Sequence, residues 1–379
     1  MTAANPAARP PYNVPAVLMF TISTGLLLTV FPWYLMTHAI PLGAWVAGVI
    51  LLYACGISIT GGYHRLWAHR AYEAHWSLKL FYLLFGAMAF QNSVLVWAST
   101  HRIHHAQVDD IDHDPYSISR GLWYAHMGWM LRDYPSAKTD FSNARELLDD
   151  RMVMFQHRHY LPLALFMNIG LPALLGLAMG DVWGYLAIAG LRLVVNHHVT
   201  FMINSLAHYW GRRPYTVENS ARDNDVLAFL TYGEGYHNYH HLFQWDYRNG
   251  VRWWQYDPTK WLIAGLSWVG ITRNLRRVPE FRIQRAMLQR QFEAVRERMT
   301  RCKHEGRLAA LRQQFEQELE TFKATVDAWS QLQSQRIEAA RGKLADQWQH
   351  SDVRQQLLAL EDRLREQRGR MRSLQLQMA

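Results

Sequence analysis

The feature that most constrains the fold is a long stretch without charged side chains. Between Arg9 and Arg65 the sequence contains no Asp, Glu, Lys or Arg. An α-helix needs roughly 20 apolar residues to cross the hydrocarbon core of a bilayer, and this stretch holds two segments of about that length. A second pair follows later, with only Gly180 and Asp181 between its members. We expect four transmembrane helices, at residues 16–36, 42–60, 161–179 and 182–206.

Nine histidines lie beside these segments, in three short clusters and one outlier. They are His64, His69, His101, His104, His105, His208, His237, His240 and His241. Residues three or four apart share a face of a helix, so each HxxHH cluster can direct three imidazoles to one place. His64 and His69 are five apart, about 140° around an α-helix, which favours ligation of two adjacent metals. Nine imidazoles are too many for one ion, so the clusters predict two, from the metals that imidazole suits.

The charge and the cysteines narrow the class of protein. A formal net charge of +9 would fit nucleic acid, anionic lipid or an acidic protein partner. The basic residues flank apolar segments and no nucleic-acid motif occurs, so we exclude nucleic acid. The two cysteines, Cys55 and Cys302, exclude a disulfide framework and are typical of a reducing compartment. The N-terminus shows no pattern of a removable signal peptide.

A fifth uncharged segment decides how the clusters can meet. If the chain crossed the membrane again within residues 80–100, the first two clusters would lie on opposite faces. We therefore interpret residues 76–98 as an embedded or interfacial helix, supported by the polar pair Gln91 and Asn92. The two tight external turns contain no Lys or Arg, so the positive-inside rule places both termini and all clusters in the cytoplasm. Arg192 lies inside the last span, where we expect it to snorkel or to pair within the bundle.

The C-terminal part has a different composition. From about residue 276 the chain is rich in Gln, Arg and Glu, and its apolar residues step by three and four. This interrupted heptad pattern predicts a helical hairpin or coiled coil. The positions are Leu288, Phe292, Val295, Met299, Cys302, Leu308, Leu311, Phe315, Phe322, Val326, Trp329, Leu357, Leu360 and Leu364.

The predicted fold class is thus an all-α integral membrane protein with a cytosolic helical cap that carries the histidines. We expect an N-terminal tail at 1–15, a membrane domain with its cap at 16–275, and an amphipathic helical or coiled-coil extension at 276–379. Self-association through the extension is the simplest role for it. The ten other histidines are interpreted as structural, including His197 and His198, two or three turns from Asn204 and His208.

The ligand types indicate iron. Structural zinc sites are mostly built with Cys, and soluble di-iron bundles use Glu and Glu-x-x-His pairs. An all-nitrogen set at a membrane surface fits two irons that activate O₂ to attack an unactivated C–H bond. Such chemistry requires the substrate chain to be held near the metals and water to be excluded. An apolar tunnel from the bundle would do both.

The order HxxxxH, HxxHH, HxxHH resembles the membrane fatty acid desaturase superfamily. In the residues around and between these motifs, the chain looks like the Δ9 acyl-CoA desaturases of the stearoyl-CoA type, over roughly residues 15–275. The matching stretches are GYHRLWAHR at 62–70, FQN at 90–92 with Trp97, DP at 114–115 with RG at 120–121, NSLAH at 204–208, RPY at 213–215, GEGYHNYHH at 233–241 and DY at 246–247.

This resemblance implies a ligand set. One iron would take His64, His101, His105 and His240, with Asn204 through water. The other would take His69, His104, His208, His237 and His241. That division agrees with the helical geometry, which puts His64 and His69 on different metals. Gln91 and Trp97 would line a kinked acyl channel, and the kink would select the cis product.

The implied activity is O₂-dependent desaturation of a saturated acyl chain, with two electrons and two waters formed, at Δ9 and on acyl-CoA. An alternative is a lipid or hydrocarbon hydroxylase of the same superfamily, and a third is a metal-binding membrane scaffold or sensor. Ser99 and Ser119 stand where animal relatives carry basic residues near the CoA head group, and only Arg120 remains. The carrier therefore stays open between CoA, a phospholipid and another thioester.

The electron donor must be a separate protein, because the chain has no haem-binding His-Pro-Gly-Gly motif. A ferredoxin-, rubredoxin- or cytochrome b5-like donor with its reductase would suit the basic cytosolic face. We expect a multi-pass protein of a bacterial inner membrane, with its termini and active site in the cytoplasm.

Overall fold

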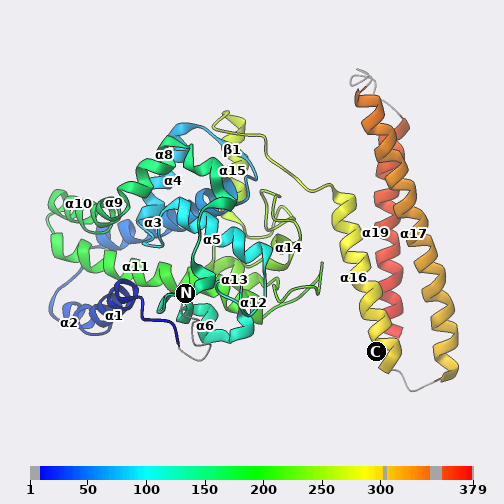
Figure 1. The fold of residues 1–379 in the computed structure, drawn as a ribbon, viewed down its shortest axis with the longest axis horizontal. Coiled ribbons are helices and arrows are strands. Elements are labelled where there is room, and N and C mark those ends of the chain that lie inside the picture. The colour runs from blue at the N-terminus through cyan, green and yellow to red at the C-terminus, as the bar shows by residue number, and fades with distance from the viewer. Residues whose placement is uncertain (1–8, 302–304, 342–351, 378–379) are drawn as a thin grey trace, which may run out of the picture. The chain divides into compact units, whose positions relative to one another are not determined.

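The computed structural model describes residues 9–301, 305–341 and 352–377, which are mostly helical (Figure 1). The chain divides into two compact units. The first consists of Met1–Arg212 and Asn219–Arg277, and the second of Arg213–Glu218 and Val278–Ala379.

The first unit holds the apolar helices and the histidines. Its helices are α1 (Val14–Leu28), α2 (Val30–Thr37), α3 (Leu42–Ile57), α4 (Trp76–Ala87), α5 (Val94–Ala106), α6 (Leu122–His126), α7 (Arg145–Leu148), α8 (Arg151–Arg158), α9 (Tyr160–Leu165), α10 (Leu171–Met179), α11 (Val182–Asn204), α12 (Leu206–Tyr209), α13 (Asp225–Leu230), α14 (His237–Leu242) and α15 (Pro258–Trp268). Short π-helical stretches extend α3 and join α9 to α10; they are Ser58–Ala68 and Phe166–Gly170. Single 3₁₀ turns lie at Ile118–Arg120, Gly128–Met130, Pro135–Ala137 and Ser142–Ala144.

Within the described residues, four continuous helical segments are long and apolar enough to cross a membrane, which confirms the prediction. They are Val14–Thr37, Leu42–Ala68, Tyr160–Met179 and Val182–Tyr209. Many of their large apolar side chains are exposed, as a lipid-facing surface requires. The turn between the last two is closed by Gly180 at φ 82° and by Asp181, whose carboxylate accepts the backbone N–H of Gly184. The chain is a multi-pass membrane protein.

The fifth apolar segment forms two helices instead of one. Helix α4 has 12 residues, too few to span a bilayer, and α5 begins at Val94. Between them Phe90 and Asn92 adopt the left-handed conformation, with φ of 55° and 74°. No α-helix continues through such residues, so the chain turns there. The polar pair at 91 and 92 marks this turn.

The core of the first unit forms where the Ser58–Ala68 stretch, α4 and α5 meet. Gln156 on α8 lies in it with 1% of its surface exposed. Its side-chain oxygen accepts the N–H of Val94, at 2.9 Å, and its amide donates to the Leu83 carbonyl, also at 2.9 Å. Gln156 therefore satisfies the end of α4 and the start of α5 together.

Arg192 of α11 is also buried, at 3% exposure. Of the two arrangements expected for it, the structure shows pairing within the bundle. Its guanidinium donates to the Met88 carbonyl at 3.0 Å and to the Asn168 side-chain oxygen at 2.5 Å.

A two-stranded antiparallel sheet closes the unit. Strand β1 (Glu73–Ala74) pairs with β2 (Thr272–Arg273), with Glu73 opposite Arg273. This pairing joins the segment that follows the first histidine cluster to the end of the unit.

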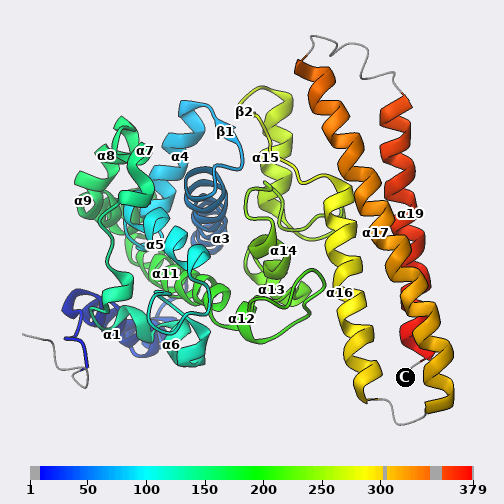
Figure 2. The same ribbon diagram turned by 45° about the vertical axis from the view of Figure 1, so that its right-hand side comes forward.

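The second unit contains three long helices side by side, α16 (Glu280–Arg301), α17 (Glu305–Arg341) and α19 (Asp352–Gln377) (Figure 2). They confirm the predicted helical extension. Their shared core includes the heptad residues Leu288, Phe292, Val295, Met299, Leu311, Phe315, Leu360 and Leu364. Two other heptad positions, Cys302 and Leu308, fall outside the side chains that the structure describes.

Replacing Gln156 by Leu should destabilise the first unit by about 3 kcal/mol, because it strands two buried backbone groups. Thermal unfolding of the purified protein in detergent would measure the loss. The exposed Gln107→Leu substitution is the control and should change the midpoint little. An unchanged midpoint for Gln156→Leu would show that water or another group replaces these hydrogen bonds.

Candidate metal centre and the adjoining cavity

The fold brings all nine predicted histidines into two adjoining groups. Within each group the candidate ring nitrogens all lie within 4.8 Å of one another. The first group is His64, His69, His101, His105 and His240, and the second is His104, His208, His237 and His241. Their elements are the Ser58–Ala68 stretch, α5, α12 and α14, so segments far apart in sequence contribute to each.

The Nε2 atoms point inward. In the first group His240 Nε2 lies 3.0 Å from His64 Nε2 and 3.0 Å from His105 Nε2. In the second, His237 Nε2 lies 3.1 Å from the Nε2 atoms of both His208 and His241. Neutral imidazoles that converge in this way direct their lone pairs to one space, which is how they surround a cation.

The environment keeps these rings neutral, the form that binds a metal. Burial, followed by the neighbouring imidazoles, lowers the pKa of His69, His101, His105 and His240 well below its usual range. Burial and the nearby His104 lower the pKa of His237 to about 3. All of these rings are therefore unprotonated at neutral pH.

Two carboxylates fix the orientation of imidazole rings by contacting the Nδ1 atom, on the side of the ring away from Nε2. His64 Nδ1 donates to Glu234 at 3.0 Å, and His104 Nδ1 donates to Asp114 at 2.9 Å. A neutral ring that donates through Nδ1 presents its unprotonated Nε2 on the opposite side. Burial alone would raise the pKa of Glu234, but His64 and Arg65 beside it lower that pKa to about 2. Glu234 therefore accepts as a full carboxylate.

Neutral oxygen atoms contact two further rings. His101 Nδ1 lies 3.1 Å from the Tyr116 hydroxyl, and His208 Nδ1 lies 2.7 Å from the Ser220 hydroxyl. Ser220 in turn donates to Asp109 at 2.5 Å. Each group thus has rings fixed by partners on its outer side, as metal-binding histidines require.

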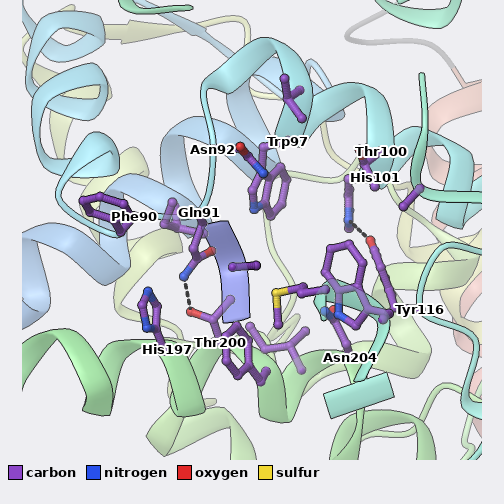
Figure 3. Close-up of a pocket in the computed structure, with 18 of the residues that line it drawn as sticks. Phe90, Gln91, Asn92, Trp97, Thr100, His101, Tyr116, His197, Thr200 and Asn204 are labelled. Atoms are coloured by element: carbon purple, nitrogen blue, oxygen red, sulfur yellow. Dashed lines mark hydrogen bonds between the residues drawn. The ribbon is translucent and has the colours of Figure 1, made fainter. Parts of the chain in front are cut away.

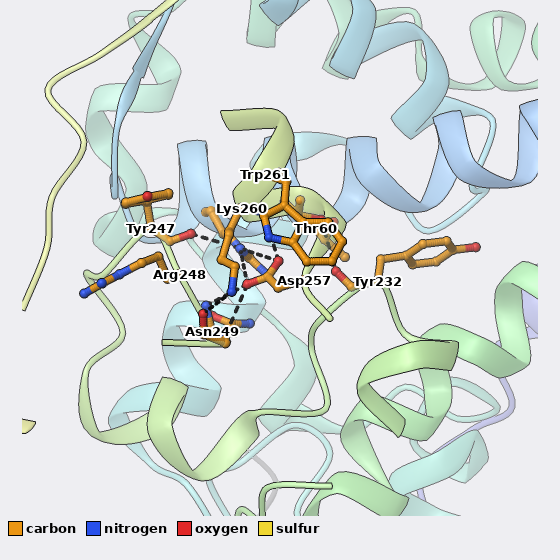
Figure 4. A network of polar contacts seen from close by, with 12 residues as sticks. Thr60, Tyr232, Tyr247, Arg248, Asn249, Asp257, Lys260 and Trp261 are labelled. Atoms are coloured by element: carbon orange, nitrogen blue, oxygen red, sulfur yellow. Dashed lines mark hydrogen bonds and ion pairs between the residues drawn. The ribbon is translucent and has the colours of Figure 1, made fainter. Parts of the chain in front are cut away.

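Asn249, Asp257 and Lys260 belong to a buried polar network (Figure 4), and this network supports Glu234. Arg65, 1% exposed, donates to Glu234 at 2.9 Å and to Asp257 at 3.1 Å. Asn249 donates to the other Glu234 oxygen at 2.7 Å. Lys260 donates to the carbonyl of Gly250 at 2.6 Å and so closes the loop that carries Asn249. The network holds the carboxylate in one position.

Two glycines make room for Glu234. Gly233 has φ of 101°, and a Cβ there would lie 2.6 Å from an Asp257 oxygen. A Cβ on Gly235 would lie 2.1 Å from the Ala228 backbone nitrogen. The Gly-Glu-Gly sequence therefore reflects close backbone approach immediately before α14.

The ring nitrogens group His69 differently from the predicted division of the ligands, and the iron that His69 binds stays a prediction. We assigned His69 to the group of His104, but its ring nitrogen belongs with His64, and its Nε2 lies 2.9 Å from His101 Nε2. The stretch from Ser58 to Ala68 is a π-helix, in which the N–H of residue i+5 bonds residue i, and His69 N–H donates to the His64 carbonyl at 3.0 Å. The wider turn places residues five apart on one face. The 140° argument assumed an α-helix, whereas the structure has a π-helix at these residues.

A cavity leads to the two groups (Figure 3). His64, His101 and His237 form part of its wall, with Tyr116 and Glu234. The predicted substrate residues Gln91 and Trp97 also line it, as does Asn204, the predicted water-mediated ligand. The Trp97 ring stacks on His101, with ring centroids 4.8 Å apart. The cavity wall and the first histidine group are therefore in direct contact.

The third predicted substrate residue, Arg120, lies outside the lining. Its guanidinium donates to the Ile111 carbonyl at 2.7 Å and to the Tyr124 hydroxyl at 3.1 Å. Two cations that sequence reasoning missed, Arg132 and Lys138, do line the cavity. No motif surrounds either one, and only the folding of the 128–138 segment over α1 places them there.

Comparison with known proteins agrees with this geometry. The family model described as Fatty acid desaturase matches residues 41–268. The chain is 45% identical over 243 residues to "Acyl-CoA desaturase 1" of Saccharomyces cerevisiae, covering 63% of this chain and 47% of that protein. It is 47% identical over 243 residues to "Probable acyl-CoA desaturase" of Schizosaccharomyces pombe, covering 63% and 50%. It is 34% identical over 279 residues to "Stearoyl-CoA desaturase 5" of Bos taurus, covering 70% and 81%.

The chain spans about half the length of the two yeast relatives. The matched residues include three of the four apolar helical segments, from Leu42 onward, and all nine histidines, so the match includes every candidate metal ligand among the histidines. The resemblance in the histidine motifs is confirmed, and the chain belongs to the fatty acid desaturase family.

Proposed function

We propose that this protein is an O₂-dependent acyl desaturase that introduces a cis double bond at Δ9 into a saturated chain carried as acyl-CoA. The observation that carries the proposal is the cavity whose wall contains rings from both histidine groups. A chain bound there lies against both groups at once. The names of the relatives, acyl-CoA and stearoyl-CoA desaturases, support the same activity.

Two irons would occupy the two groups. The first would bind among His64, His69, His101, His105 and His240, and the second among His104, His208, His237 and His241. Asn204, in the cavity wall, would reach an iron through water. The donor set fits, because the rings are neutral, converge through Nε2 and are fixed from behind. When bound, the irons supply the O₂ activation that an unactivated C–H bond requires.

The overall reaction balances without another oxidant. Two hydrogens leave adjacent carbons of the acyl chain, and O₂ with two electrons and two protons becomes two waters. The chain's own residues hold the substrate and exclude water from the reacting carbons. Gln91 and Trp97 bend the acyl chain in the cavity, and the bend favours the cis product.

Two basic side chains line the cavity. Arg132 and Lys138 in the wall suit the phosphates of an acyl carrier. Arg120 acts through its neighbours: its guanidinium lies over the ring of Tyr134, 5.2 Å from the centroid, and Tyr134 lines the cavity. We propose that Arg120 shapes this part of the cavity instead of meeting the substrate directly.

The electrons come from a separate donor protein, of the ferredoxin, rubredoxin or cytochrome b5 type, with its reductase. We place the four spans in a bacterial inner membrane, with the histidines and both termini in the cytoplasm. This orientation gives a soluble donor access to the site. It also follows the distribution of Lys and Arg along the sequence.

Lipid analysis tests the activity. Expressed in a host that lacks an endogenous desaturase but supplies a donor, the wild-type chain should produce a new cis-monoene. His104→Ala should reduce it by more than about 100-fold, because even losing the hydrogen-bond partner of a metal ligand costs about 10- to 100-fold. The exposed His113→Ala is the matched control. A hydroxylated product from the wild-type chain would show that the protein is a hydroxylase and would contradict the proposed desaturation.

Metal analysis tests the centre independently of turnover. The purified wild type should contain two irons per chain, measured by mass spectrometry of the metals. His237→Ala should lower the content to about one or less, since it removes a ligand from the four-histidine group. His159→Ala, an exposed histidine, should leave it unchanged. Full iron content in His237→Ala would remove that residue from the site.

We further propose the domain division at 1–15, 16–275 and 276–379, with the extension serving assembly. A chain truncated after Arg277 should keep desaturation within about twofold and run as a smaller species in size-exclusion chromatography with light scattering. The core of the extension consists of its own helices. Lost activity in a truncated chain that still binds iron would instead assign electron delivery to the extension.

A further inference from the structure

Two side chains of α11 hold the turn between α4 and α5 through backbone carbonyls. Arg192 donates to the Met88 carbonyl at 3.0 Å, and His197 Nε2 donates to the Ala89 carbonyl at 3.0 Å. Both side chains are buried, at 3% and 2% exposure. Met88 follows the last residue of α4, so these carbonyls belong to a helix end that has no helical partner for them.

A third contact from the same helix reaches the side chain of the turn. The amide of Gln91 donates to the Thr200 hydroxyl at 3.0 Å, and that hydroxyl donates to the Asn196 carbonyl at 2.9 Å (Figure 3). We call Arg192, His197 and Thr200 together the α11 clamp. Three groups of the turn, the carbonyls of Met88 and Ala89 and the side-chain amide of Gln91, are thus fixed to a single helix.

The turn depends on such support. Phe90 and Asn92, on either side of Gln91, are in the left-handed region, which costs energy for residues other than glycine. A strained turn stays in one conformation only where its surroundings determine it. Without the clamp, the two carbonyls would be left unpaired in an apolar setting and the turn would have other conformations available.

The turn forms part of the cavity wall. Phe90, Gln91 and Asn92 line the cavity on one side, and His197 and Thr200 face them from α11 (Figure 3). Trp97, which also lines it, stacks on His101 of the first histidine group. The position of the turn relative to the histidines therefore sets where a bound chain bends relative to the metals.

We infer that Arg192 and His197 are positioning residues that fix which pair of acyl carbons faces the two metals, and so determine the position of the double bond. The inference rests on the proposed desaturase function and adds to it the origin of regioselectivity. Neither residue touches the reacting carbons. Each acts by keeping Gln91 in place through the backbone of the turn.

The inference is tested by comparing the His197→Leu variant with the His198→Leu variant, which serves as a control at the neighbouring residue. His198 is hydrogen bonded to His126, away from the turn. Expressed as above, the products would be derivatised with dimethyl disulfide and their double-bond positions read by mass spectrometry. In His197→Leu the ratio of shifted to wild-type isomer should rise by about fivefold or more, the effect of one lost hydrogen bond. His198→Leu should keep the wild-type ratio.

A merely structural role predicts something different. It would lower the total monoene without moving the double bond, so a single unchanged isomer in His197→Leu overturns the inference whatever the yield. His197→Gln, which keeps a donor in reach, should restore the wild-type isomer. If His197→Leu fails to accumulate, the nearly isosteric Thr200→Val decides, by the same criterion of isomer ratio. A wild type that makes no monoene would count against the proposed function itself.

Discussion

The molecule depends on holding nine imidazoles of the first unit close together and facing one another. No apolar environment stabilises such a set on its own, because each ring has two polar nitrogens that need partners. The outer nitrogens of four rings meet Glu234, Asp114, Tyr116 and Ser220. The inner nitrogens meet only one another, so the arrangement is complete when cations lie between them. Much of the polar chemistry of the first unit serves this geometry.

This demand explains why the most buried charges gather behind the histidines. Arg65, Glu234 and Asp257 form a compensated set, since Arg65 donates to both carboxylates. A buried ion pair of this kind contributes little net stability, and removing one member leaves an uncompensated charge. Its value lies in direction: Glu234 can face His64 from only one side. The buried charges fix the orientation of the His64 ring, and the surrounding fold must supply hydrogen-bond partners for each of them.

The sequence indicates much of this structure, and the departures have physical causes. The four spans follow from apolar length, and the nine histidines follow from spacing and ligand chemistry. The position of the His69 ring beside His64 could not be derived, because no local pattern in residues 58–68 indicates a π-helix. The break between α4 and α5 was visible only as two polar residues. Arg132 and Lys138 line the cavity because of the tertiary fold, which local sequence patterns do not encode. Arg120 was singled out by a sequence motif, and in the structure its guanidinium donates to the Ile111 carbonyl and the Tyr124 hydroxyl.

The π-helical stretch after α3 has a mechanical consequence. It continues a membrane-crossing helix without a loop, so the rod that spans the bilayer also bears His64 on its final turns. Helices adjust to bilayer thickness by tilting, and a tilt of this rod moves a metal ligand with it. The hydrophobic thickness of the membrane therefore affects the position of His64 relative to the other histidines. With the proposed desaturation, the protein would respond to the thickness of the same membrane whose acyl chains its product enters.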